Sequence, residues 1–471
     1  MSDLERVLAE VLAEVKPAPD ERNKALELFE RVKHLIEENL RLPYDYTIEL
    51  HGSVAKGTEL RGDIDLDVFV LIRYEDLSEA WLKENVVAPL YEVFRRVYSS
   101  TKLKYATHPY INIKVGNYEI DVVPAYWARD ISEIRTAVDR TPFHTRYVIS
   151  RLDERSRDEV RLLKSFLKGV GVYGAEIKVE GFSGYLAELL VIKYGSFVNV
   201  IRSATSWRYG EVLVIDGSVD SLTASKLRRI FRAPLIVLDP IDTRRNAASA
   251  VSAESLAKFV AASYMFLENP STSFFRTSRL EPAVTRTTGQ QLKQVVEATD
   301  RELLGVVFGV ARGTPPDVIW GKLRSVARSL LNLLRKYGFT TVSYLVWSDE
   351  ESEALLLVTV LPRELPRYEI HAGPPLGKRS DMAAYMAANS RRPGALGPYV
   401  DPDGRLFFLI PRRFRYPYQV VESYVSSLRD LELLYPIKVL RDAAEVESYV
   451  AQKSSDELVK ALERVVLLRL L

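Results

Sequence analysis

The 471-residue sequence contains no cysteine, and it has no apolar run long enough to cross a membrane. The lack of cysteine excludes disulfide bonds, thiolate zinc sites and cysteine nucleophiles, and it fits an intracellular protein. The N-terminus reads as an acidic helical pattern rather than a signal peptide. We therefore expect a cytoplasmic protein with no membrane partner.

The chain also has little net charge, because 65 lysines and arginines oppose 63 aspartates and glutamates and leave a formal charge of +2. Any binding to nucleic acid must therefore come from local basic patches. The apolar share of 47% and the charged share of 27% are ordinary for a globular protein. The length allows about three domains of ordinary size.

The most informative stretch is an apolar strand that carries three acids. Asp63, Asp65 and Asp67 are two residues apart, so a strand places all of them on the same face. Their like charges repel unless a cation lies among them, and such hard oxygen ligands suit Mg²⁺. Two metal-binding pairs fit this spacing, Asp63 with Asp65 and Asp65 with Asp67. Spacing alone does not decide between these two pairs. The alternative, a solvated strand edge, is disfavoured by the apolar flanks.

Gly52 and Ser53 precede this strand, separated from it by a short segment that we expect to be mobile. Their N–H groups and hydroxyl can approach a triphosphate closely, since glycine has no side chain in the way. Gly-Ser followed by Asp-apolar-Asp-apolar resembles the signature of the polymerase-β nucleotidyltransferase superfamily. The superfamily normally follows its second acid with a sustained apolar strand, and such a run follows Asp67. The resemblance therefore implies Asp65 and Asp67 as metal ligands, with Asp63 in reserve. Such a site needs a third carboxylate, and Asp121 lies in the expected context, a predicted hairpin strand that ends at Pro124.

A helix predicted over residues 157–168 follows, with Ser156 as its N-terminal cap. Steps of three and four residues place Arg161, Lys164 and Lys168 on one face of it. A basic helix face is usually only solvated. The position of this one, after an acidic strand, favours contact with a triphosphate.

Seven blocks along the chain narrow the family further. They are GSVAKGT with DLDVF, EIDVVPAY, AVDRTPFH, EVRLLKSFLKGVGVYGAE, GFSGYLAELL, YGSF and DPIDTRRNAAS. In this order they resemble the archaeal (class I) CCA-adding enzymes, which are tRNA nucleotidyltransferases. The resemblance is strong over residues 20–280 and weaker up to residue 430. The Gly-Ser and Asp-x-Asp signature alone would also fit poly(A) polymerases and oligoadenylate synthetases, whereas RTPFH, VYGAE, GFSGYL and RRNAA are much narrower.

The resemblance implies nucleotide-binding roles for residues in these blocks. Ser53 and Lys56 would hold the triphosphate, with lysine at a position where many relatives have arginine. His144, Lys164 and Tyr173 would bind the sugar and phosphates of the incoming nucleotide.

By the same resemblance, Arg245 would contact the base edge and help to select C and A over U and G. Arginine only donates hydrogen bonds, and C and A share an acceptor nitrogen beside an exocyclic amine, where U and G carry N–H. The adjacent Arg244 could be confused with it. His108 would either position the primer end or be a buried structural histidine.

The expected fold class is α+β with several domains. A polymerase-β-like nucleotidyltransferase head, a mixed sheet with helices, would span residues 1–150, and a helical or mixed central nucleotide-binding (neck) domain would span residues 151–280. For the region 281–471, body and tail, the resemblance implies αβ domains of RNA-binding type, and the strand–helix–strand–strand order predicted there is compatible with them. Arginines interleaved with aromatics suit an RNA surface, although such runs are often only solvated strand edges. These arginines are Arg391, Arg392, Arg412, Arg413 and Arg415.

The sequence thus predicts a template-independent enzyme that builds or repairs the CCA end of tRNA from CTP and ATP. Asp65, Asp67 and Asp121 would bind two Mg²⁺ ions for in-line transfer that releases pyrophosphate. The acceptor stem and stacked arm of tRNA would contact the C-terminal region, and a homodimer is left open. The alternative is a related poly(A) or oligoadenylate-type nucleotidyltransferase and, more remotely, a catalytically silent RNA-binding protein.

Overall fold

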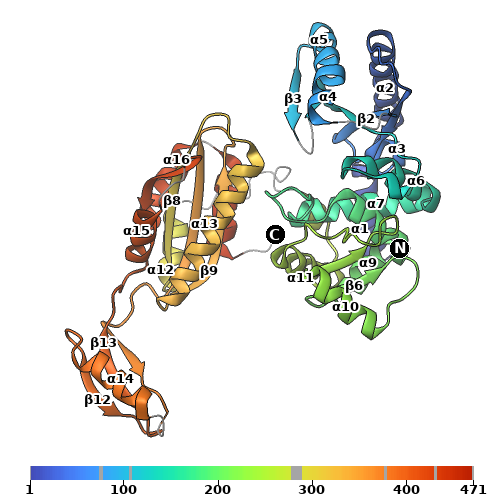
Figure 1. Cartoon of the computed structure of the whole chain (residues 1–471). Helices are drawn as coiled ribbons and strands as arrows, with labels where there is room; N and C mark the ends of the chain where they lie inside the picture. The colour runs from blue at the N-terminus through green and yellow to red at the C-terminus, as the bar shows by residue number, and fades with distance from the viewer. Residues whose placement is uncertain are drawn as a thin grey trace. The chain divides into compact units, whose positions relative to one another are not determined.

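The computed structural model describes residues 2–73, 78–105, 109–276, 289–375, 379–428, 432–453 and 455–468. The chain divides into two compact units, an N-terminal unit over residues 1–281 and a C-terminal unit over residues 282–470 (Figure 1).

A five-stranded mixed sheet in the order β1-β2-β5-β4-β3 forms the head of the N-terminal unit. The central strands β2 and β5 run parallel, and the other neighbours are antiparallel. The mixed sheet with helices that the sequence predicts is therefore confirmed. The strands are β1 (Tyr46–His51), β2 (Ile64–Ile72), β3 (Thr101–Tyr105), β4 (Pro109–Val115) and β5 (Tyr118–Tyr126).

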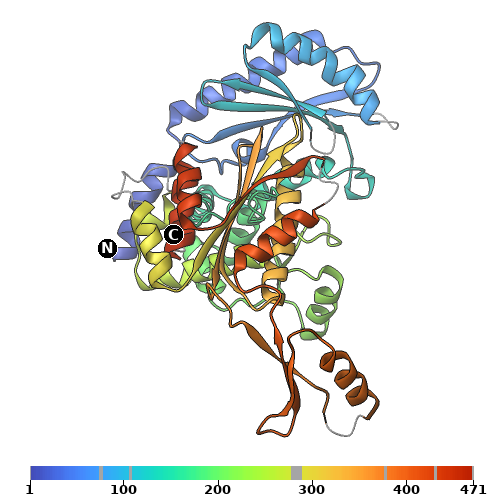
Figure 2. The ribbon, with the colours of Figure 1, turned by 90° about the vertical axis from the view of Figure 1, so that its left-hand side faces the viewer.

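One face of this sheet is apolar and is covered by two helices that pack against each other, α2 (Pro19–Asn39) and α5 (Ala88–Val97) (Figures 1 and 2). The even-numbered residues of β2 are buried in this core together with Ile36 of α2 and Phe94 of α5. Because side chains alternate along a strand, Asp65 and Asp67 are left on the opposite face. The short helix α4 (Glu79–Leu82) and the π-helical turn Lys83–Val87 lead into α5.

The rest of the N-terminal unit is mainly helical. Its core is an aromatic cluster in which Phe166 contacts Phe197, Phe259, Phe266 and Phe274. The helices are α1 (Asp3–Val15), α3 (Gly52–Lys56), α6 (Thr141–Arg151), α7 (Glu154–Val170), α8 (Gly184–Tyr194), α9 (Phe197–Ala204), α10 (Ser221–Phe231) and α11 (Ala253–Glu268), with 3₁₀ turns at Ile131–Glu133, Val138–Arg140 and Thr272–Phe275. A small parallel pair, β6 (Glu211–Val214) and β7 (Leu235–Leu238), packs against α10.

The start of α7 differs from the prediction. The helix begins at Glu154, and its cap is Asp153, whose Oδ1 accepts a hydrogen bond from the Ser156 N–H at 2.8 Å. Ser156 is therefore a first-turn residue and not the cap, because a carboxylate three residues earlier already satisfies the free N–H.

Within the ranges that the structure describes, no single helix is long and apolar enough to cross a membrane. The pair α8 and α9, bent by 93° at its break, passes by length and composition only. Both helices contribute buried residues to the core, including Leu189 and Ile201.

The C-terminal unit contains a four-stranded antiparallel sheet in the order β14-β8-β10-β9. Its strands are β8 (Glu302–Val310), β9 (Thr340–Ser348), β10 (Glu353–Leu361) and β14 (Leu434–Leu440). One face is covered by α13 (Pro316–Lys336) and α15 (Pro417–Ser427). The other face is covered by α12 (Gly289–Ala298), α16 (Ala443–Gln452) and α17 (Asp456–Leu467) (Figure 1). The predicted strand–helix–strand–strand order is present as β8, α13, β9 and β10.

A second, three-stranded antiparallel sheet follows β10 in the order β11-β13-β12. It is built from β11 (Tyr368–Ala372), β12 (Leu396–Val400) and β13 (Leu406–Pro411), together with α14 (Arg379–Ser390). Every described residue of β12 is exposed, so this sheet is covered by its helix on one side at most.

Candidate active site

A row of polar residues crosses the open face of the head sheet. His51 of β1 is in register with Asp67 of β2, Asp67 with Asp121 of β5, and Asp121 with Asn112 of β4. Side chains opposite one another on neighbouring strands point to the same face, so the two aspartates are neighbours on it. Asp65 lies one step along the same face, opposite Glu119. The strand pairing thus brings together the three carboxylates that the sequence singled out.

Gly52 lies against this row because it has no side chain. It adopts a left-handed conformation with φ +68°, and an added Cβ would lie 1.7 Å from Asp67 Oδ2. No other residue fits there without displacing the carboxylate. Ser53 follows Gly52 in α3, the helix that begins directly after β1.

The electrostatics of the row are those of crowded acids. Burial raises the pKa of Asp65 to about 6, and the charges of Asp63, Glu119 and Asp121 add to this effect. Burial and the charge of Asp121 raise the pKa of Asp67 to about 7, against the opposing influence of Lys56. Burial also raises the pKa of Asp121. These acids hold their protons more tightly than usual because burial disfavours the charged form and because the neighbouring carboxylates repel one another.

Asn112 is a residue of this row that the sequence did not single out. It is buried, and its Nδ2 donates to Glu119 Oε1 at 2.7 Å and to Asp121 Oδ1 at 2.5 Å. Lys104 Nζ donates to the same oxygen of Glu119 at 2.5 Å. Asn112 therefore orients Asp121. Only the pairing of β4 with β5 could identify it, because an asparagine in an alternating strand has no distinctive pattern.

The donor set fits a divalent cation by its chemistry. Carboxylate oxygens are the ligands of hard cations, and a cation among them would remove the repulsion that raises their pKa values. Within the described parts of the chain, no group of three or more histidine, aspartate or glutamate side chains is arranged closely enough to hold an ion as it stands. The nucleotidyltransferase family typically uses divalent metal ions, and Asp65, Asp67 and Asp121 are the residues here that fit one.

Asp63, the reserve metal ligand, lies outside the strand. β2 begins at Ile64, and Asp63 forms an ion pair with Lys168 of α7. Its side chain is half exposed. The geometry therefore groups Asp65 with Asp67, and it assigns Asp63 and Lys168 to each other.

The segment between α3 and β2, expected to be mobile, is buried over residues 57–60, where a side chain of α7 binds it, and exposed over residues 61–63. Arg161 donates from Nε to Glu59 O at 3.0 Å and from Nη2 to Gly57 O at 2.6 Å. Arg161 and Glu59 are both buried. The expectation of mobility does not fit residues 57–60, because carbonyl groups there are satisfied from a distant helix, which local sequence does not reveal. Arg161, expected on a triphosphate-binding face, is committed to this segment.

Lys56 and Lys164 meet at a glutamate that sequence reasoning missed. Glu188 of α8 is fully buried, and its Oε2 accepts from Lys56 Nζ at 2.6 Å. Its Oε1 accepts from Thr58 Oγ1 at 2.7 Å and Lys164 Nζ at 3.3 Å. Burial alone would raise the pKa of Glu188, but the two ammonium groups hold it below the usual value and keep the carboxylate ionised. The only sequence signal was a single acid within the apolar helix GYLAELLVI.

A second cluster surrounds Asp239, which is buried. Its Oδ2 accepts from Arg245 Nη1 at 2.7 Å and lies 3.0 Å from His144 Nε2, and its Oδ1 accepts from Tyr185 OH at 3.0 Å. Burial alone would raise the pKa of Asp239, but these hydrogen bonds hold it far below the usual value. The His144 ring stacks on Tyr185 with centroids 4.0 Å apart. Burial lowers the pKa of His144 despite the bond to Asp239.

The two adjacent arginines are distinguished by their partners. Arg245 is oriented by Asp239 beside His144, and 35% of its side chain is exposed. Arg244 pairs with Asp242, and 81% of its side chain is exposed. Arg245 is therefore the arginine that belongs to the cluster around Asp239, together with His144.

Tyr173 lies beside Lys168, and both it and Lys164 lie close to Gly184. The Lys168 ammonium is 5.2 Å from the centre of its ring, and an added Cβ on Gly184 would lie 3.0 Å from its hydroxyl. Burial raises the pKa of Tyr173, so the ring stays neutral.

The arginines considered for RNA binding have different environments. Arg391 and Arg392 are exposed after α14, and neither forms an ion pair within the described residues. Arg412 pairs with Glu369 at 2.7 Å and Arg415 pairs with Glu364, whereas Arg413 lies 4.9 Å from the ring centre of Phe414. His108 lies outside the described residues.

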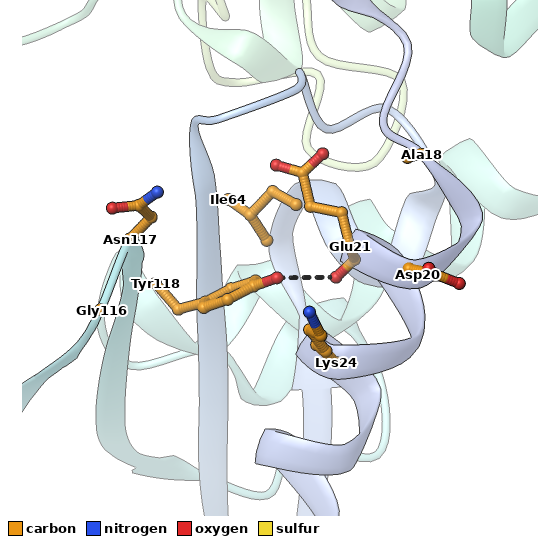
Figure 3. A pocket seen from close by; sticks show the side chains of 8 residues that line it. All are labelled: Ala18, Asp20, Glu21, Lys24, Ile64, Gly116, Asn117 and Tyr118. Atoms are coloured by element: carbon orange, nitrogen blue, oxygen red, sulfur yellow. Dashed lines mark hydrogen bonds between the residues drawn. The ribbon is translucent and has the colours of Figure 1, made fainter.

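An open pocket of about 430 Å³ lies at the start of β2 and β5, against α2 (Figure 3). Tyr118 OH donates to Glu21 O across it at 3.1 Å. No residue of the carboxylate row lines it. Its lining consists of Ala18, Asp20, Glu21, Lys24, Ile64, Gly116, Asn117 and Tyr118.

Three family models match successive parts of the chain. They describe a nucleotidyltransferase domain over residues 32–144, the second domain of tRNA nucleotidyltransferase over residues 158–276, and the C-terminal domain of the CCA-adding enzyme over residues 302–430. The first two divide the N-terminal unit, and the third lies in the C-terminal unit.

Curated relatives agree with these models. The CCA-adding enzyme of Pyrobaculum islandicum is 39% identical over 91% of this chain and 95% of its own length. That of Pyrobaculum neutrophilum is 40% identical over 88% and 91%, and that of Sulfurisphaera tokodaii is 38% identical over 86% and 88%. The family predicted from the motifs is confirmed. The chain belongs to the family of CCA-adding enzymes, which are nucleotidyltransferases that act on the 3′ end of tRNA.

Proposed function

We propose that the carboxylate row of the head sheet transfers nucleotides from CTP and ATP to the 3′ end of tRNA. The observation that carries this proposal is the register of Asp67 with Asp121, beside Asp65 and under Gly52. Asp65, Asp67 and Asp121 would hold Mg²⁺, which supplies neutralising charge for the triphosphate and for the transferring phosphoryl group.

Asp121 is proposed to accept the proton of the terminal 3′-hydroxyl. The oxygen of that hydroxyl forms a bond to the α-phosphorus, while the bond from this phosphorus to the bridging oxygen of the β-phosphate breaks and pyrophosphate leaves. Asn112 keeps one oxygen of Asp121 in place, so the other is available to the proton. Ser53, Lys56 and Lys164 would hold the departing phosphates.

Nucleotide choice is proposed to depend on Arg245. Its guanidinium is fixed by Asp239, so its remaining N–H groups are preoriented for the acceptor nitrogen that C and A present. His144, stacked on Tyr185, and Tyr173 would contact the sugar and phosphates. Because the pKa of His144 is lowered, its imidazole is neutral near pH 7 and one ring nitrogen can accept a hydrogen bond.

The domain assignment is proposed as a head over residues 1–150, a neck over 151–280 and a tRNA-binding body and tail over 281–471. The C-terminal unit would contact the acceptor stem and stacked arm through arginines such as Arg391, Arg392 and Arg413, which are free of salt bridges within the described residues. A homodimer and a cytoplasmic location stay expectations.

The test uses tRNA transcripts that end before, within and after CCA, with Mg²⁺ and each nucleoside triphosphate added separately. We expect addition of C, C and then A, followed by arrest. Unlimited addition of A alone would instead support a poly(A)-type activity. Firm tRNA binding without any incorporation would contradict the proposed role of the carboxylate row.

A further inference from the structure

We propose that Glu188 is a positioning residue of the nucleotide site, where it holds the ammonium groups of Lys56 and Lys164 together so that both bind the triphosphate. This inference rests on the proposed function, since it requires that the two lysines contact a nucleotide.

Glu188 connects three segments that are distant in sequence. It projects from α8 and accepts hydrogen bonds from Lys56 at the end of α3, from Thr58 in the following loop and from Lys164 in α7. Thr58 Oγ1 also accepts from Lys164 Nζ at 3.0 Å. All four side chains are buried. Lys164 Nζ donates to Thr58 O at 3.1 Å as well. Both oxygens of the carboxylate are used, so Glu188 is the side chain of the cluster that binds both ammonium groups.

The cluster contains more positive charge than its carboxylate balances. One ammonium group would compensate one buried carboxylate, but two are present, which leaves a surplus positive charge. Lys56 also acts on the Asp67 carboxyl of the neighbouring row, whose pKa it lowers. Once a cation neutralises that row, the second ammonium group would be balanced by an additional anion. The surplus lies next to the catalytic row, because Lys56 ends the helix whose first residue, Gly52, is in contact with Asp67. A triphosphate is the anion that the proposed reaction brings there.

Replacing Glu188 by glutamine keeps the size of the side chain but removes this arrangement. The amide oxygen can accept from one of the lysines, whereas the NH₂ group faces the other and, like an ammonium, only donates. One lysine therefore loses its anchor and is also repelled by its neighbour.

The experiment measures equilibrium binding of a non-hydrolysable CTP analogue, a non-hydrolysable ATP analogue and tRNA to the full chain. For Glu188→Gln, we expect the dissociation constants of both nucleotides to rise by about tenfold. The dissociation constant of tRNA should stay unchanged. In a Lys56→Ala background, Glu188→Gln should raise the nucleotide dissociation constant by less than it does in the wild type, because Glu188 acts through the lysines.

Glu59→Gln is the matched control. Glu59 is also a buried glutamate, it lies in the same loop, and it pairs with Arg22 and Arg161 but with neither lysine of the cluster. It should lower the melting temperature and leave nucleotide binding unchanged. If Glu188→Gln does not fold, Thr58→Val replaces it. That variant removes one donor to Glu188 and one acceptor for Lys164, and we expect about a threefold rise in the nucleotide dissociation constant.

Two results would overturn the inference. One is unchanged nucleotide binding by Glu188→Gln or Thr58→Val, and the other is an equal weakening by Glu188→Gln and Glu59→Gln. Either would mean that Glu188 only stabilises the packing of α8. A wild-type chain that binds neither nucleotide would contradict the proposed function itself, and the wild-type measurement separates that failure from the other two.

Discussion

At the scale of single residues, the functional side chains are held by partners of opposite character. Glu188 holds Lys56 and Lys164, Asp239 holds Arg245, and Asn112 holds one oxygen of Asp121. Asp65 and Asp67 are different, because the structure crowds them with other acids. The lysine and arginine side chains are therefore oriented by acidic partners. The central carboxylates repel one another, and a bound cation would remove this repulsion.

This crowding has a measurable effect on stability. In the unfolded chain, Asp67 loses its proton near its ordinary pKa, about 4, whereas in the folded chain its pKa is about 7. Between these values the folded state binds more protons, so stability falls as pH rises and the full cost is present above pH 7. We predict that Asp67→Asn raises the free energy of unfolding of the metal-free chain by about 2 kcal/mol at pH 8 and changes it little at pH 4.

Chemical denaturation at the two pH values checks this prediction. The same variant should lose incorporation by about a thousandfold or more, because a ligand of the proposed metal site is gone. Addition of Mg²⁺ should stabilise the wild type more than the variant. Equal stability of both chains at pH 8 would show that Asp67 does not carry the cost of the crowded row.

The two adjacent arginines provide a test of nucleotide selection. Arg245→Ala should weaken discrimination of CTP and ATP against UTP and GTP by about tenfold to a hundredfold, because the preoriented donor is lost. Arg244→Ala is the control, since that side chain is exposed and pairs with Asp242. The measurement is kcat/KM for each nucleotide on one tRNA transcript. If the Arg244 variant loses selectivity and the Arg245 variant does not, the proposed roles of the pair are reversed.

At the scale of elements, the contact of α3 with β2 is the junction on which the site depends. At Gly52, an added methyl group would meet Asp67 Oδ2 at 1.7 Å, and the residue has a positive φ. Gly62, in the turn just before β2, also has a positive φ of +70°, but nothing lies within 4 Å of an added Cβ. A comparison of alanine substitutions at the two positions therefore separates the effect of backbone strain from the effect of the contact with Asp67.

We predict that Gly62→Ala costs about 1 kcal/mol of stability and keeps its activity, because only the left-handed conformation is disfavoured. Gly52→Ala should cost about 2–4 kcal/mol and abolish incorporation, because the carboxylate must move as well. Thermal unfolding and single-nucleotide incorporation measure both effects. An active Gly52→Ala variant would contradict the close packing of α3 against the carboxylate row.

The elements also show which parts of the site could be predicted from the sequence. The placement of Asp65 and Asp67 on one face follows from the two-residue period of a strand, which is a local property. Glu188 and Asn112 could not be identified in this way, because their roles depend on the lysines or carboxylates that the fold places opposite them. The cap Asp153 is different: its contact with the Ser156 N–H three residues on is local, so the sequence offered it as well as Ser156. Residues 57–60 after α3 were misjudged for the same reason as Glu188 and Asn112, since Arg161 satisfies their carbonyl groups from α7.

At the scale of the whole molecule, a net charge of +2 means that no general field attracts RNA. Affinity for tRNA must come from particular basic side chains that are not already neutralised. Arg412 and Arg415 are paired with Glu369 and Glu364, so reversing their charge would disturb the fold as well as any RNA contact. Arg391 and Arg392 form no such pairs within the described residues, which makes them the cleaner test.

We predict that the double variant Arg391→Glu with Arg392→Glu weakens tRNA binding about tenfold or more at low salt. In a plot of the logarithm of the binding constant against the logarithm of salt concentration, the slope of this variant should be less steep than that of the wild type. KM for CTP at saturating tRNA should not change, because the proposed nucleotide-binding residues lie in the N-terminal unit. The matched control is Arg391→Lys with Arg392→Lys, which keeps both charges and should bind nearly as the wild type does.

Loss of binding in the lysine variant would indicate recognition by the guanidinium shape rather than by charge. Each phosphate contact that is lost lowers the number of counterions released when tRNA binds, and so lowers the salt dependence. An undiminished salt dependence in the glutamate variant would therefore place the phosphate contacts elsewhere on the chain.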